Sequence, residues 1–218
     1  MGKALSAPLF WVDLAMSMKE SRFVNRIWKA QHLVLYKLGL RSYARLHKPI
    51  IKKYLSAVLK TTPYPIVIET GCIRDANEGT ESTLTIASTL MERGTFYTFE
   101  ISKEHITTCQ ELCQGYNQYI NYIEGDSVEN LTRMVAESAF DTVHFALFDS
   151  VNDGAHIWRE FKAVENLFRK HATIIVDDVL WGDKGRLIKP YLASSPEWQT
   201  KVYNVEYGML VAKRIAEP

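Results

Sequence analysis

Residues 66–72, Ile-Val-Ile-Glu-Thr-Gly-Cys, constrain the fold more than any other part of this 218-residue chain. Three successive β-branched residues predict a buried strand, and Gly71 at its end lets the backbone turn sharply and approach a ligand. A polar loop then leads through Gly79 to Ser82 and Thr83, which predict the start of a helix. A strand, a loop with glycines and a helix in this order build the nucleotide pocket of many α/β proteins, although the same elements also occur in α/β domains without a ligand.

The residue types in this segment restrict which chemical class of ligand can bind there. Backbone amides of Ser82 and Thr83 have no partner within the predicted helix, so they would attract a carboxylate or a phosphate. Glu69 at the strand end would repel a phosphate but attract an ammonium or sulfonium group. The spacing of Gly71 and Gly79 excludes the dinucleotide motif G-x-G-x-x-G, and no P-loop sequence occurs. S-adenosylmethionine, which has an amino-acid end and a positive sulfur, fits these requirements.

Two later strands are predicted to add acidic residues to the same pocket. Residues 95–100 form a short β-rich run that ends in Glu100, roughly 30 residues after the first strand, where a βαβ unit places a carboxylate on ribose hydroxyls. A third apolar run ends in Gly125, Asp126 and Ser127. Asp126 could accept a hydrogen bond from an adenine amine. Asp126 or Ser127 could equally cap the next helix, and the two roles are compatible.

A second group of carboxylates follows two further apolar runs. Asp149 comes directly after residues 143–148, and Asp177 and Asp178 come after residues 172–176. The carboxyl ends of parallel strands lie on one edge of a sheet, so these three side chains are predicted to converge. They would repel one another unless a hard cation such as Mg²⁺ or Ca²⁺ neutralises them. Asp149 could instead cap a helix or contact the cofactor without any ion.

Over roughly residues 64–213 the chain resembles the class I S-adenosylmethionine-dependent methyltransferases. Glu69-Thr-Gly71 with Gly79-x-x-Ser82-Thr83 is similar to the first motif of that family, Glu100 to the second and Gly125-Asp126-Ser127 to the third. The long loop between Cys72 and Glu81 departs from the tighter glycine turn of most members. The predicted cofactor-binding residues are Glu69, Gly71, Cys72, Gly79, Ser82, Thr83, Glu100, Ile101, Asp126, Ser127 and Asp149.

This resemblance implies an α/β fold with a Rossmann-like, seven-stranded, mostly parallel sheet and helices on both faces. A closing antiparallel hairpin is also indicated by the alternating apolar residues in 197–203 and 207–213. We therefore expect a basic helical extension over residues 1–62 and a methyltransferase domain over residues 63–218.

Asp177-Asp178-Val-Leu-Trp181-Gly resembles the metal-binding segment of the divalent-cation-dependent O-methyltransferases, which include catechol, caffeoyl-CoA and macrolide-sugar enzymes. The resemblance implies that Asp149, Asp177 and Asp178 bind Mg²⁺, and that neighbouring hydroxyls of a small acceptor complete its coordination. Methyl transfer to a hydroxyl of a sugar, phenol or natural product is therefore the expected activity. Asp178 stands where the catechol enzymes have Asn.

Asp153 and His156 are the candidates for a general base that removes the proton of the acceptor hydroxyl. Each also has an ordinary explanation. Asp153 lies in an Asn-Asp-Gly turn sequence, and His156 could lie on the surface of a helix.

Charge is unevenly distributed along the chain. Residues 1–60 contain 12 Lys or Arg against 2 Asp or Glu, whereas the remainder has 14 against 23. The basic residues alternate with apolar ones at helical spacing, which predicts two basic amphipathic helices. These helices could cover the acidic domain or a second subunit of a homodimer, bind an anionic substrate or membrane surface, or bind nucleic acid. An RNA-directed methyltransferase and a non-catalytic cofactor-binding scaffold are accordingly the alternative functions.

Composition agrees with a cytoplasmic enzyme. The three cysteines are odd in number and lack the spacing of a zinc site, and no apolar run approaches the length of a transmembrane helix.

Overall fold

A computed structural model of the chain describes residues 47–74, 81–205 and 207–217. Most of the basic N-terminal segment and Gly79, on which several predictions depend, lie outside these residues. None of the helices in the described ranges combines the length and the apolarity that crossing a bilayer requires.

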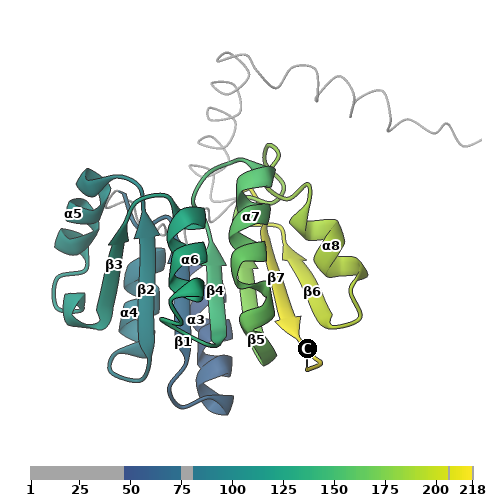
Figure 1. The fold of residues 1–218 in the computed structure, drawn as a ribbon, viewed down its shortest axis with the longest axis horizontal. Coiled ribbons are helices and arrows are strands. Elements are labelled where there is room, and N and C mark those ends of the chain that lie inside the picture. Colours follow the sequence, from purple (N-terminus) through teal and green to yellow (C-terminus); the bar gives the residue numbers. More distant parts are fainter. Residues whose placement is uncertain (1–46, 75–80, 206, 218) are drawn as a thin grey trace, which may run out of the picture. The chain divides into compact units, whose positions relative to one another are not determined.

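Seven strands form one mixed sheet in the order β3-β2-β1-β4-β5-β7-β6. Strands β1 to β5 pair in parallel, whereas β7 runs antiparallel between β5 and β6 (Figure 1). This arrangement confirms the predicted Rossmann-like sheet and its closing hairpin. The strands are β1 (Ile66–Thr70), β2 (Thr95–Glu100), β3 (Ile120–Glu124), β4 (Val143–Phe148), β5 (Phe168–Val176), β6 (Trp198–Tyr203) and β7 (Met209–Arg214).

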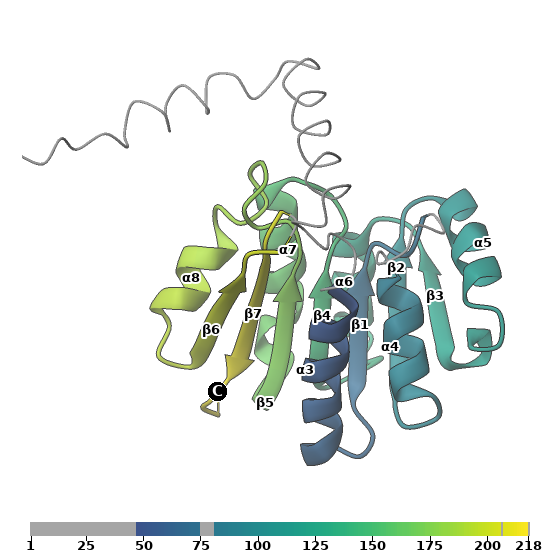
Figure 2. The same ribbon diagram turned by 180° about the vertical axis from the view of Figure 1, so that it is seen from behind.

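Helices cover both faces of the sheet. One face packs against α3 (His47–Thr61), α4 (Ser82–Leu90) and α5 (Lys103–Leu112), and the other against α6 (Ser127–Ala136), α7 (Gly154–Val164) and α8 (Ile188–Ser194). Figure 1 is seen from the side of α6 and α7, and Figure 2 from the side of α3 and α4. Two single 3₁₀ turns, η1 (Asn117–Tyr119) and η2 (Glu165–Leu167), precede β3 and β5.

Successive residues of the central strands face opposite layers, as the pleat requires. In β1, Val67 belongs to the core cluster under α3 and α4, and Ile68 to the cluster under α6 and α7. Alternation therefore places Glu69 on the same face as Val67, which matters for the site described below.

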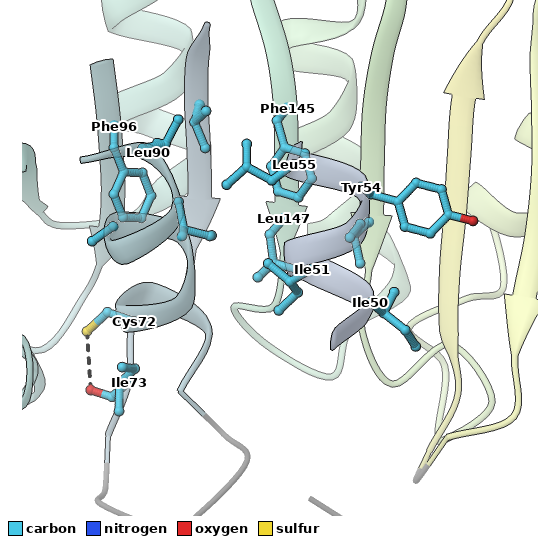
Figure 3. Packing of buried hydrophobic residues seen from close by; sticks show 14 of the residues in the cluster. Ile50, Ile51, Tyr54, Leu55, Cys72, Ile73, Leu90, Phe96, Phe145 and Leu147 are labelled. Atoms are coloured by element: carbon cyan, nitrogen blue, oxygen red, sulfur yellow. Dashed lines mark hydrogen bonds between the residues drawn. The ribbon is translucent and has the colours of Figure 1, made fainter. Parts of the chain in front are cut away.

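Helix α3 is part of the core rather than a separate cap. Ile51 and Leu55, four residues apart on one helix face, are almost completely buried among residues that include Phe145 and Leu147 of β4 (Figure 3). Tyr54 points toward the C-terminal hairpin, and its hydroxyl lies 2.7 Å from that of Tyr203. Helix α3 therefore packs on the sheet, and the predicted boundary between an extension over residues 1–62 and a domain over residues 63–218 stays a prediction.

Candidate active site

Two adjoining cavities lie at the carboxyl edge of the parallel strands. The smaller has a volume of about 300 Å³ and the larger about 520 Å³. Arg74, Ser150 and Val151 line both, so one opens beside the other. The smaller cavity is also lined by Gly71, Phe99, Glu100, Ile101, Gly125, Asp126, Ser127 and His156, and the larger by Cys72, Ile73, Ser82, Asp149, Asn152, Asp178 and Lys184. Eight of the predicted cofactor-binding residues are therefore brought together at this edge.

Gly71 is required where β1 ends. Its φ is +82°, and a Cβ added there would lie 2.4 Å from the carbonyl oxygen of Asp149. The Gly71 amide donates to the carbonyl of Phe99 over 2.8 Å, so the turn is fixed between the ends of β2 and β4. Any side chain would strain this close approach.

Glu100 is held by a set of donors at the end of β2. Its carboxylate accepts hydrogen bonds from the amides of Ser102 at 3.0 Å and Cys72 at 3.4 Å, and it lies 3.3 Å from Nδ1 of His105. Arg74 Nε lies 3.8 Å away. The side chain is 5 % exposed and lines the smaller cavity. A fixed carboxylate at this position can accept hydrogen bonds from a pair of ligand hydroxyls.

Glu69 does not line either cavity, which corrects the expectation that it attracts a ligand's positive charge. Its side chain is completely buried against α4. Oε2 accepts hydrogen bonds from the hydroxyls of Thr83 at 2.7 Å and Thr98 at 2.9 Å. Burial raises the pKa of Glu69 to about 8, although these hydroxyl bonds act in the opposite direction. The carboxyl group therefore connects β1, β2 and α4 inside the layer.

Thr83 also differs from its predicted role. Its hydroxyl donates to Glu69 and accepts from the amide of Ile73 at 3.1 Å, and the residue is fully buried. Of the two residues predicted to open α4 toward a ligand, Ser82 alone lines the larger cavity.

Asp126 caps α6, one of the two roles considered for it, by accepting a hydrogen bond from the amide of Glu129 at 3.0 Å. Asp126 also lines the smaller cavity, so its role as a helix cap is compatible with contact to a ligand there. The neighbouring Ser127 hydroxyl donates to the buried carboxylate of Glu160 and lies 3.0 Å from Nε2 of His156. Glu160 also accepts from Thr70 at 3.1 Å. This buried network joins β1, α6 and α7 under the smaller cavity.

The two candidate bases, Asp153 and His156, are not among the residues that line the larger cavity. Asp153 is exposed and caps α7 by accepting from the amides of Ala155 at 2.8 Å and His156 at 3.3 Å. These amide bonds hold its pKa below the usual value. His156 lines the smaller cavity, and its hydrogen bond with Glu160 raises its pKa. The role of a general base for either residue stays a prediction.

A lysine lies close to the three aspartates predicted to bind a metal and interacts electrostatically with each of them. Lys184 donates to Oδ1 of Asp149 over 2.7 Å. Oδ1 of Asp177 accepts from the amide of Asp178 at 3.0 Å, and Oδ2 lies 3.6 Å from Nδ1 of His47. Within the described part of the chain, no three His, Cys, Asp or Glu side chains have the arrangement of a metal site.

Burial and neighbouring charges together shift the pKa values of these groups. It raises the pKa of Asp177 well above the usual range, with further contributions from Asp149 and Asp178, and it raises the pKa of Asp178 to about 6. Burial lowers the pKa of Lys184, but the neighbouring carboxylates, Asp149 first, raise it above the ordinary value on balance. The site thus retains an ammonium among the acids.

Sequence reasoning missed several lining residues. Phe99 and Ser150 adjoin predicted positions, so their neighbours in the chain could have indicated them. Lys184 gave no such signal, because it lies 35 residues from Asp149, its partner in the salt bridge.

The chain matches the O-methyltransferase family over residues 52–207. The chain belongs to this family. Membership confirms the predicted activity, S-adenosylmethionine-dependent methyl transfer to a hydroxyl of a small molecule. A search among curated proteins gave no match.

Solved structures of methyltransferases share the fold. An O-methyltransferase from Bacillus cereus in complex with SAH is 18% identical, with 85% of this chain and 89% of that chain covered and a TM-score of 0.62. The O-methyltransferase TomG from Streptomyces achromogenes, involved in tomaymycin synthesis and solved with SAM, is 17% identical, with coverages of 77% and 80% and a TM-score of 0.61. A methyltransferase from Geobacter sulfurreducens is 13% identical, with coverages of 95% and 96% and a TM-score of 0.58.

Proposed function

We propose that this O-methyltransferase binds the adenosine part of S-adenosylmethionine in the smaller cavity and its methionine part in the larger one. Glu100 is the observation that carries the proposal. Its carboxylate is oriented by backbone amides and lines the smaller cavity at the end of β2, where it can accept hydrogen bonds from both ribose hydroxyls. Asp126, two strands away from β1 at the same edge, supplies an acceptor for the adenine amine.

The larger cavity has the groups that the rest of the cofactor and the acceptor require. Ser82 lies at the first turn of α4, where unpaired amides favour the carboxylate of the methionine end. Asp149 and Lys184 line the same cavity. An acceptor hydroxyl placed beside these groups would face the sulfonium at the junction of the two cavities. In the transfer the acceptor oxygen forms a bond to the methyl carbon as the sulfur–carbon bond breaks, S-adenosylhomocysteine is the leaving group, and the Asp149 carboxylate in the same cavity accepts the hydroxyl proton. The step depends on holding the oxygen in line with the sulfur–carbon bond, and such alignment alone lowers barriers by several kcal/mol.

The Mg²⁺ predicted from the sequence does not fit the donor set. The Lys184 ammonium lies 2.7 Å from Oδ1 of Asp149. Oδ1 of Asp177 accepts a hydrogen bond from the amide of Asp178, and Oδ2 of Asp177 lies near the ring of His47. A divalent ion binds oxygen donors at 2.0 to 2.6 Å and is repelled by a neighbouring positive charge, so no step of the proposed reaction passes through a metal.

Isothermal titration with S-adenosylhomocysteine tests the cofactor site. We expect Glu100→Ala to weaken binding about 100-fold, since two charge-assisted hydrogen bonds contribute roughly 1.5 kcal/mol each. Glu104→Ala is the matched control, because Glu104 is exposed in the first turn of α5. Equal affinity of the Glu100→Ala variant and the wild type would refute the proposed cofactor site.

The acceptor is tested by measuring S-adenosylhomocysteine release with a panel of phenols, catechols, sugars and hydroxylated natural products. We expect turnover with at least one small hydroxyl compound. Turnover on RNA but on none of these compounds would contradict the proposal. The homodimer, membrane and nucleic-acid hypotheses rest chiefly on residues 1–46, outside the described part of the chain, and stay predictions.

A further inference from the structure

Lys184 is an unusual residue to find at the edge of this sheet. Its side chain is 1 % exposed, and a lysine is almost never buried to that extent unless its charge is paired. The ammonium donates to Asp149 over 2.7 Å and also interacts electrostatically with Asp178 and Asp177. The residue lines the larger cavity. The acidic cluster at the ends of β4 and β5 is therefore already supplied with a positive charge by the chain itself.

The turn that carries Lys184 is fixed by close backbone approaches on both sides. A Cβ on Gly185 would lie 2.4 Å from the carbonyl oxygen of Val179, and one on Gly154 would lie 2.3 Å from that of Asp183. The two glycines therefore let residues 183–185 pack between the segment after β5 and the start of α7. Packing on both sides directs Lys184 into the cluster rather than to solvent.

The three carboxylates do not point toward one common centre. Asp149 has its oxygen on Lys184, and Asp177 is turned toward the amide of Asp178 and the ring of His47. Asp177 is absent from the lining of the larger cavity, whereas Asp178, with φ of +57°, is part of it. Three carboxylates that served one cation would have to point toward a common position.

We propose that the Lys184 ammonium takes the place of the divalent cation that the sequence predicts at this edge. It forms an ion pair with Asp149, interacts favourably with the charge of Asp178 and Asp177, and provides a fixed positive charge beside the cavity where the acceptor binds. This inference rests on the proposed function for the location of the acceptor, but the occupant of the acidic cluster can be measured without any acceptor or cofactor.

Electron paramagnetic resonance with Mn²⁺ as the probe tests the inference on the full chain. We expect the wild-type protein to leave the signal of free Mn²⁺ unchanged. Lys184→Ala removes the ammonium and leaves the acids, so this variant is expected to bind Mn²⁺ at least about 10-fold more tightly than the wild type. The gain should disappear in the Lys184→Ala/Asp149→Ala double variant. Lys170→Ala, at an exposed position of β5, is the control and should behave like the wild type.

Stoichiometric Mn²⁺ binding by the wild type that is lost in Asp149→Ala would overturn the inference. So would a folded Lys184→Ala protein that gains no affinity for Mn²⁺. Circular dichroism establishes folding, and if the alanine variant does not fold, Lys184→Met keeps the side-chain volume and the wild-type titration still decides the question. Calorimetry with S-adenosylhomocysteine in parallel separates the two proposals, because failure of cofactor binding by the wild type would count against the proposed function and leave the Mn²⁺ result unaffected.

Discussion

The replacement Glu69→Gln is expected to change how the stability of the protein depends on pH. Glu69 is completely buried, and its pKa is about 8 in the folded protein against an ordinary value of 4.5. In the unfolded chain the group ionises near its ordinary value. Between these two pH values the folded state therefore binds more protons than the unfolded state, and stability falls as pH rises.

The magnitude follows from the two pKa values. Each pH unit in this window costs about 1.4 kcal/mol, which amounts to about 5 kcal/mol once the pH exceeds 8. Gln has nearly the shape of the protonated acid and keeps an oxygen that accepts from Thr83 and Thr98. We therefore expect the variant and the wild type to have similar stability near pH 5, and the variant to be more stable by about 3 kcal/mol near pH 7.

Urea denaturation followed by circular dichroism at several pH values between about 5 and 9 measures this difference. Glu104→Gln, at an exposed position of α5, is the control and should show no such trend. A difference between Glu69→Gln and the wild type that stays constant over this range would refute the reasoning. It would mean that Glu69 is ionised in the folded protein or that the site opens to water.

Three further predictions concern the architecture around the site. Gly71→Ala should lower the free energy of unfolding by about 2 kcal/mol or more, because its φ is +82° and its Cβ would meet the carbonyl of Asp149; an unchanged urea midpoint would contradict this. Leu55→Ala should cost about 2–5 kcal/mol, since Leu55 is fully buried where α3 meets the sheet; a loss below about 1 kcal/mol would show that α3 is not part of the core. NMR titration should find the pKa of His156 above 6.5 in the wild type and lower in Glu160→Gln, because the bond to Glu160 stabilises the charged ring. The contribution of this ion pair to the stability of the folded protein is fully present below pH 6.5 and is lost as pH rises through the pKa of His156 in the folded state.

The positions of three residues that line the smaller cavity could be predicted because their determinants are local. Gly71, Glu100 and Asp126 each follow directly after a strand, and the carboxyl ends of parallel strands must share one edge. The strands themselves were recognisable from their β-branched and apolar residues, and the hairpin from alternation. A helix cap also depends on nearby residues, so the role of Asp126 in capping α6 could be predicted from the chain alone.

The surroundings of Asp149 and Glu69 could not be predicted, because they depend on contacts between segments that are far apart in the chain. Asp149 meets Lys184 across 35 residues, and Glu69 meets Thr98 across 29. The sequence pattern placed these carboxylates at the ends of strands, but it did not state which layer each side chain enters. That direction is set by the pleat and by the turns that pack above it.

The sequence by itself thus determined the order of strands and helices, the Rossmann-like class and the position of Glu100 at the end of β2, since these follow from short-range preference and chain topology. Tertiary structure alone decided that Glu69 lies inside the layer and that an ammonium occupies the acidic cluster. The physical reason is that burying a charge is costly without a partner, and the partner of a buried charge is fixed by packing between segments that are far apart in the chain.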